Sequence, residues 1–142
     1  MFKKILVPTD ASEFSRRALT TALTLARLFK AEVELLHVTY TPQAYLGYIV
    51  SYGLAISQDE LDHNGELALE AAVAGIDMSD VQFKKCVESG HPVSVILDEI
   101  KQKNIDLVVM GSHGYGPIMG SVLGSVSQKV LQRAECPVMI VK

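Results

Sequence analysis

The chain has 142 residues, of which 49% are hydrophobic and 20% are charged, and its formal net charge is −3 at pH 7. This length suits one domain, and the composition is that of a soluble globular protein. A negative net charge without a basic stripe argues against nonspecific binding of nucleic acid. Cys86 and Cys136 show no metal-ligand spacing, and we expect them to be small buried side chains in a reducing compartment.

No export signal and no membrane-spanning segment are expected. Pro8 and Asp10 end the apolar run at 5–7 well short of a signal-peptide core. The longest apolar stretch, at 44–56, is too short and too interrupted to cross a bilayer. The sequence therefore predicts a cytoplasmic protein without membrane insertion.

Strand and helix patterns alternate along the chain. Short apolar runs predict strands, and apolar positions at three- and four-residue spacing predict helices. Asp10 or Ser12 is expected to cap the first helix. In chain order, the predicted elements are a strand at 5–7, a helix at 12–30, a strand at 32–39, a helix at 58–74, a strand at 81–88, a helix that begins at Pro92, a strand at 105–110, a helix at 126–134 and a strand at 137–141.

This alternation predicts an α/β fold. Right-handed crossovers would place the strands in one parallel sheet with helices on both faces. Ligands of such sheets lie beyond the carboxyl ends of the strands, where the strand order reverses. If the first and fourth strands are neighbours, the turn at 8–12 faces the loop that begins at Gly111.

That loop, which joins a strand to a helix, is the most informative feature of the sequence. Gly111 and Gly114 follow an apolar strand, and Gly124 comes directly before a helix. Backbone N–H groups and the dipole of a helix N-terminus favour an anion at such a junction. Because Ser125 and Ser127 can add hydroxyl groups, the loop predicts a site for a phosphate-bearing ligand. The alternative is an ordinary loop with a serine cap.

The loop differs from the motifs of phosphoryl transfer. It is not a GxxxxGK[ST] loop, and no lysine or arginine occurs between Gly111 and Ser127. Charge neutralisation would come from backbone amides, the helix dipole and a bound divalent ion. This chemistry suits holding a nucleotide better than transferring its terminal phosphoryl group.

Together with the opening segment, the glycine spacing resembles that of the universal stress proteins of the UspA family. Nucleotide-binding members carry a G-x2-G-x9-G-[ST] pattern, which Gly111, Gly114, Gly124 and Ser125 match. The opening run KILVPTDAS and the closing run CPVMIV also resemble the family, so the similarity covers essentially the whole chain. The resemblance implies one universal stress protein domain at 1–142, with a Rossmann-like, five-stranded parallel sheet in the order 3-2-1-4-5.

The resemblance also implies roles for individual residues. Asp10 would approach the ribose, where a carboxylate can accept hydrogen bonds from hydroxyl groups. Val38 and Met110 would pack against adenine or belong to the core, and His113 would contact phosphate or be a simple loop residue. The full expected nucleotide-binding set is Pro8, Thr9, Asp10, Ala11, Val38, Met110, Gly111, His113, Gly114, Gly124, Ser125, Val126 and Ser127.

The expected function is that of an ATP-binding regulatory protein of stress responses that acts as a nucleotide-dependent dimeric switch. AMP or ADP could replace ATP, and Mg²⁺ or Mn²⁺ would be held mainly by the phosphates. The alternative is a slow ATPase or another nucleotide-hydrolysing enzyme on the same site. A flavodoxin-like FMN carrier is a rival within the fold class, although Asp10 would repel a phosphate there. No catalytic residues are expected, and His37, His63 and His91 lack metal-ligand spacing.

A homodimer is expected through the last strand. In the implied strand order, 138–141 is an apolar edge, and such an edge favours pairing with a second copy. The alternative is an edge covered by the chain's own loop. The long connection at 40–57 holds four of the five tyrosines. It is expected to be a lid, a contact surface for an unknown protein partner, or a loop folded onto its own domain.

Overall fold

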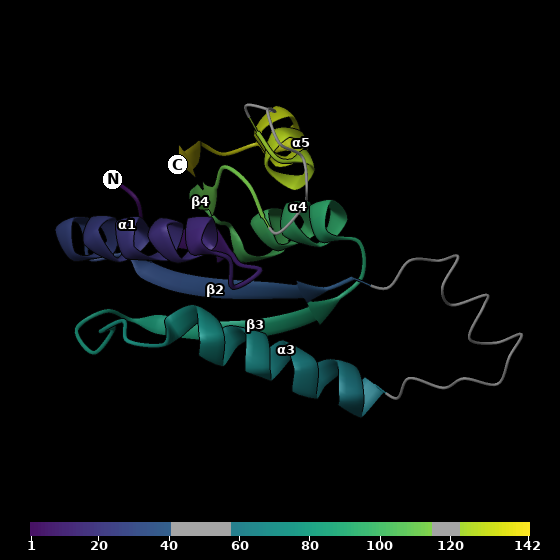
Figure 1. Ribbon diagram of the computed structural model, residues 1–142. Coiled ribbons are helices and arrows are strands. Elements are labelled where there is room, and N and C mark those ends of the chain that lie inside the picture. Colours follow the sequence, from purple (N-terminus) through teal and green to yellow (C-terminus); the bar gives the residue numbers. More distant parts are fainter. Residues whose placement is uncertain (41–57, 115–122) are drawn as a thin grey trace, which may run out of the picture.

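A computed structural model describes residues 1–40, 58–114 and 123–142 of the chain (Figure 1). Strands and helices alternate along it. The elements are β1 (Lys4–Pro8), α1 (Glu13–Phe29), β2 (Glu32–Thr39), α3 (Gln58–Val73), β3 (Phe83–Ser89), α4 (Pro92–Lys103), β4 (Leu107–Gly111), α5 (Ser125–Arg133) and β5 (Val138–Val141). The strands form one parallel sheet in the order β3-β2-β1-β4-β5, which confirms the expected fold class.

Two apolar layers sandwich the sheet. Alternate residues of a strand point to opposite faces, so β1 contributes Ile5 and Val7 to one core and Leu6 to the other. Helices α1 and α3 cover the first face, and α4 and α5 cover the second (Figure 1). The central strands are buried on both sides, which explains why they read as continuous apolar runs.

Local polar interactions set the start of α1. The Ser12 hydroxyl accepts a hydrogen bond from the N–H of Ser15 at 3.3 Å, so Ser12 is the N-cap. Asp10 instead accepts the N–H of Ser12 at 2.9 Å and closes the turn between β1 and the helix. Asp10, the other capping candidate in the sequence, therefore does not cap the helix, and its carboxylate lies at the end of β1.

Most observed bounds differ from the expected ones by one or two residues. β3 begins at Phe83 rather than at Val81, because the N–H of Val81 donates to the carbonyl of Met78 in a turn. α5 begins at Ser125, with Gly124 as its N-cap. The expected connection at 40–57 lies almost entirely outside the described residues, as do four of the five tyrosines.

The two cysteines are only half-buried, which corrects the expectation of buried side chains. Both are free thiols. Burial is still the main cause of a raised pKa in each, and for Cys86 the pKa rises to about 11. Neither thiol is therefore in the thiolate form that nucleophilic chemistry requires at neutral pH. Among the described residues, no helix is long and apolar enough to cross a membrane.

Strand order places the ligand-binding end of the sheet. β1 pairs with β2 on one side and with β4 on the other, so the direction of winding reverses between β1 and β4. The loops after these strands diverge and leave a crevice at the carboxyl edge of the sheet. The turn at Asp10 and the loop at Gly111 face each other across it.

Candidate functional site

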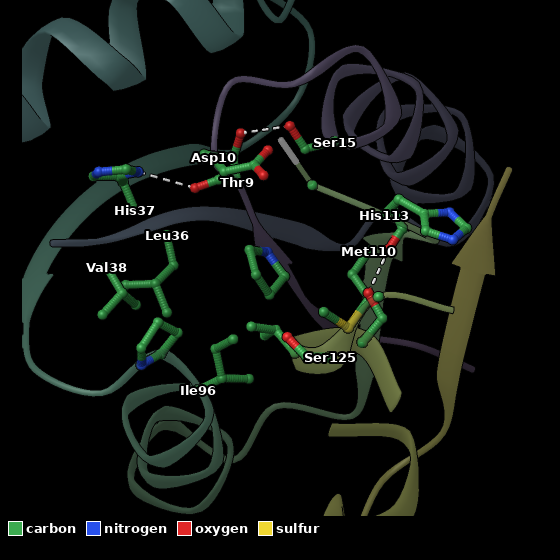
Figure 2. Close-up of a pocket in the computed structure, with 17 residues that line it drawn as sticks. Thr9, Asp10, Ser15, Leu36, His37, Val38, Ile96, Met110, His113 and Ser125 are labelled. Atoms are coloured by element: carbon green, nitrogen blue, oxygen red, sulfur yellow. Dashed lines mark hydrogen bonds between the residues drawn. The ribbon is translucent and has the colours of Figure 1, made fainter. Parts of the chain in front are cut away.

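A cavity of about 290 Å³ opens at this switch point. Residues from the ends of β1, β2 and β4 and from the N-terminal turns of α1, α4 and α5 line it (Figure 2). The lining residues are Pro8, Thr9, Asp10, Ser15, Leu36, His37, Val38, Pro92, Ile96, Met110, Gly111, His113, Gly114, Gly124, Ser125, Val126 and Ser127.

One end of the cavity is apolar. Leu36 and Val38 come from one face of β2, and Ile96 faces them from α4 (Figure 2). Leu36 and Ile96 are almost completely buried, so they form a firm wall. Met110 lies at the end of β4 and is 4% exposed. Such a slot accepts a flat apolar or aromatic group.

Hydroxyl groups shape the wall beside α1. The Thr9 hydroxyl donates to the hydroxyl of Ser15 at 3.0 Å, and the Ser15 hydroxyl donates to the carbonyl of Ser12 at 2.9 Å. Thr9 in turn accepts the N–H of Ala11 at 3.0 Å. These bonds hold the turn after β1 in one conformation and so fix the backbone that carries the Asp10 carboxylate.

Each glycine of the motif lies at a different close approach. A Cβ at Gly111 would lie 2.8 Å from the backbone carbon of Phe14, so this glycine lets α1 pack against β4. A Cβ at Gly114 would collide with the carboxylate of Asp10. A Cβ at Gly124 would lie 3.3 Å from the carbonyl oxygen of Ser112. Left-handed backbone is not what these positions need, since positive φ occurs among the described glycines only at Gly75 and Gly90.

The start of α5 faces the polar end of the cavity. Its N-cap is Gly124, which has no side chain to bond the first N–H groups, while the N–H of Gly124 itself donates to the carbonyl of Ser112 at 2.7 Å. The N-terminal N–H groups and the helix dipole therefore remain available to an anion. Ser125 is exposed at this point, beside the cavity.

Ser127 has a different role from the expected phosphate contact. Its hydroxyl is buried and donates to the carbonyl of Gly111 at 2.7 Å. The bond ties the first turn of α5 to the end of β4, across the whole glycine loop. Ser127 thus fixes the loop ends, and Ser125 is the serine whose hydroxyl lies open to a ligand.

Two histidines line the cavity walls. Nδ1 of His37 lies 3.0 Å from the carbonyl oxygen of Thr9, and because a carbonyl only accepts, this nitrogen carries the proton. Nδ1 of His113 lies 3.0 Å from the hydroxyl of Ser112, and its ring packs beside that of Phe14 with centroids 5.6 Å apart. Asp10 is the one formally charged group among the lining residues that the structure describes.

The cavity collects every residue of the expected nucleotide-binding set except Ala11, which has a φ of 63° and packs against the hydrophobic core. Sequence reasoning missed Ser15, Leu36, His37, Pro92 and Ile96. For Leu36, a signal existed, because it lies two residues before Val38 and shares its strand face. Pro92 and Ile96 gave no such signal, since only the packing of α4 brings them to the cavity.

The strand order, the crevice between β1 and β4 and the glycine turn define a Rossmann-like α/β domain with a cavity at its switch point. The chain belongs to the universal stress protein family, whose model matches residues 1–142. It is similar to Universal stress protein YxiE of Bacillus subtilis, with 35% identity over 148 residues that cover 100% of each chain.

Solved structures share this fold. The structure of MJ0577 from Methanocaldococcus jannaschii has a TM-score of 0.83 and 28% identity, and the match covers 100% of this chain and 96% of that one. A universal stress protein family protein from Arabidopsis thaliana, solved with AMP bound, has a TM-score of 0.68 and 26% identity. That match covers 99% of this chain and 91% of the other.

Proposed function

We propose that this chain binds an adenine nucleotide, ATP or its mono- or diphosphate, and acts as a regulatory stress protein. The observation that carries the proposal is that one cavity has an apolar end and a polar, anion-binding end. Leu36, Val38 and Ile96 offer an apolar slot for a base, and the uncapped start of α5 offers an anion site. The Arabidopsis relative that was solved with AMP bound supports the choice of nucleotide.

Size and shape also suit a nucleotide. The cavity of about 290 Å³ is at the small end of sites for small ligands. The base and ribose would fill it, and the phosphates would lie along the first turn of α5 beside Ser125. Asp10, fixed by the turn after β1, would accept hydrogen bonds from the ribose hydroxyls.

A divalent ion fits this site only when it is bound together with the nucleotide. Asp10 is the sole carboxylate among the described lining residues, and one carboxylate is a sparse ligand set for Mg²⁺ or Mn²⁺. Such an ion would be held mainly by phosphate oxygens and would supply neutralising charge to them. The chain's own residues bind and orient the nucleoside part.

Titration calorimetry of the purified protein with ATP, ADP and AMP tests the proposal. We expect saturable heat for at least one of them, and a rise in the melting temperature. A ligand present at about 100 times its Kd stabilises the fold by about 2.7 kcal/mol. GTP serves as the control for the base. An absence of heat and of thermal stabilisation at millimolar ATP, ADP and AMP would contradict nucleotide binding.

We expect little hydrolysis of bound ATP. Hydrolysis concentrates charge on the transferred group, and stabilising that charge usually requires a lysine, an arginine or well-held metal ions. No lysine or arginine occurs between Gly111 and Ser127. Release of phosphate, measured with an excess of ATP and Mg²⁺, should stay far below the rate of a typical enzyme, about 10 per second. Sustained turnover near that rate would favour the enzyme alternative.

The proposal includes a cytoplasmic homodimer whose nucleotide occupancy other proteins sense. The two free thiols suit a reducing compartment. The edge strand β5 has no charged residue between Val138 and Val141, and this supports pairing with a second copy.

A further inference from the structure

A buried charge cluster lies one layer below the apolar end of the cavity. Glu34 on β2 and Glu99 on α4 are each only 6% exposed. The ammonium of Lys103 lies 2.6 Å from an oxygen of each carboxylate. Lys103 itself is partly exposed, but two carboxylates are rarely buried side by side in this way without a structural or functional reason.

The cluster connects the two walls of the cavity. Glu34 lies two residues before Leu36 on the same face of β2. Glu99 follows Ile96 by one helical turn on α4. Leu36 and Ile96 face each other across the apolar slot. Lys103 links α4 to Glu34 on β2. The bridge therefore sets the distance between β2 and α4, and this distance is also the width of the apolar slot.

The ammonium is needed to keep two carboxylates in this place. Burial raises the pKa of Glu34, as does its hydrogen bond with Glu99, while the hydrogen bond from Lys103 opposes the rise. Burial lowers the pKa of Lys103, but its hydrogen bond to Glu34 and its ion pair with Glu99 outweigh that effect, and the net pKa is raised. Lys103 therefore stays charged.

Other polar groups face the cluster from neighbouring strands. Cys86 on β3 lies within 4.8 Å of both carboxylates, and burial keeps its thiol protonated with a pKa of about 11. Lys84 and Glu32 form their own pair at 2.8 Å. Together with Glu34, Lys103 and Lys4, this pair lines a second cavity of about 380 Å³, through which water and protons can reach the cluster.

We propose that Glu34, Glu99 and Lys103 are positioning residues for the ligand site, and that their bridge sets the width of the apolar slot and hence the affinity for the nucleotide base. This inference rests on the proposed function. It assigns a role to groups that touch no ligand. It also predicts that removing the ammonium makes nucleotide affinity depend on pH, although no titrating group of the cluster contacts the nucleotide.

The decisive variant is Lys103→Met, which keeps the length of the side chain and removes its charge. Two buried carboxylates would then repel each other, and α4 would move away from β2. At about pH 8 we expect nucleotide affinity to fall at least about tenfold. Protonation of one carboxyl group relieves the repulsion. The pKa of that carboxyl group is raised when α4 lies against β2, as in the wild type. The variant therefore regains this packing, and its nucleotide affinity, as the pH falls to about 6, and loses both as the pH rises.

Three further variants separate positioning from simple damage. Glu34→Gln combined with Glu99→Gln and Lys103→Met leaves a neutral cluster whose two amides can hydrogen-bond each other between β2 and α4 in place of the bridge, and affinity should return to within about threefold of wild type at both pH values. Glu34→Met breaks the bridge but leaves the balanced pair of Glu99 and Lys103, so it should fold and bind about fivefold more weakly without new pH dependence. Arg27→Met removes an ion pair with Asp80 far from the cavity and should not alter affinity.

The test is to measure the affinity of the wild type and of each variant for AMP and ATP by calorimetric titration at about pH 6 and about pH 8. Wild-type affinity for Lys103→Met at about pH 8 would overturn the inference, and so would wild-type affinity for Glu34→Met. A neutral triple variant as weak as Lys103→Met at both pH values would also overturn it. A wild type that binds no adenine nucleotide overturns the proposed function, and this inference with it. A wild type that binds, beside variants that bind equally well, overturns the inference alone.

Discussion

The variant Gly111→Ala should lose about 3 kcal/mol of folding free energy, at the upper end of the range for overpacked interiors. The added Cβ would lie 2.8 Å from both the backbone carbon and the Cβ of Phe14. Neither atom belongs to the end of a flexible side chain, so α1 or β4 must shift. The expected fall in melting temperature is about 10 °C, measured by thermal unfolding without ligand.

Gly124→Val should lower nucleotide affinity strongly while changing the stability of the fold little. The φ of Gly124 is −68°, which any residue adopts, and its added Cβ would lie 3.3 Å from the nearest atom. We expect a loss of stability below about 1 kcal/mol, since the loop of Ser112 can yield slightly. The branched side chain would fill the cavity beside the first turn of α5, and nucleotide affinity should fall more than about tenfold. Gly124→Ala should be intermediate in affinity.

This pair of variants separates the two reasons for a glycine in one motif. Equal stability of Gly111→Ala and wild type would show that α1 does not pack against β4 as closely as the structure has it. A folded Gly124→Val with unchanged affinity would place the phosphate group away from α5. The consensus spacing treats both glycines alike, and only the packing of Phe14 distinguishes them.

The fold was accessible from the sequence because its signals are local. Apolar runs such as the one that ends at Met110, and the helical spacing of apolar residues such as Leu19 and Ala22, give strands and helices in a βαβ order that allows few topologies. The glycine spacing and its position between a strand and a helix then locate the cavity. These features identify the site without any knowledge of side-chain packing.

The remaining features depend on contacts between distant segments. Nothing near Ser127 in the sequence shows that its hydroxyl bonds the carbonyl of Gly111 rather than a ligand. The bridge between Glu34 and Lys103 joins residues 69 positions apart. Its one local sign is a glutamate inside an otherwise apolar strand, Val33 to Leu36, where a charge needs a partner. A sequence shows that such a partner is required, and only the packing of α4 shows which residue it is.

The second large effect concerns the edge strand β5. The N–H of Val108 donates to the carbonyl of Pro137, and the N–H of Ser112 donates to that of Val141. Polar backbone groups alternate in direction along a strand, so those of Val138 and Ile140 point away from β4. The opposite edge, β3, exposes Lys84, Lys85 and Glu88, which discourage pairing. The uncharged β5 edge is therefore the one suited to a two-fold, antiparallel pair.

Met139→Lys should convert the proposed dimer into a monomer. Met139 is 37% exposed, so a lysine there disturbs the core of one subunit little. In an antiparallel pair around a two-fold axis, two lysines would approach each other across the new interface, and like charges there are destabilising. We expect the dimer Kd to rise at least about tenfold in sedimentation velocity, with the melting temperature of the monomer nearly unchanged.

A matched control is available on α1. Leu28 is 72% exposed and lies on a different element from β5, so Leu28→Lys makes the same change of polarity away from the proposed interface. The dimer should survive it. If Leu28→Lys dissociates the dimer and Met139→Lys does not, the subunits meet through α1 instead of β5. A wild type that remains monomeric at high micromolar concentration, with and without ATP, would exclude the β5 interface. In that case nucleotide occupancy would have to be sensed on the surface of a single subunit.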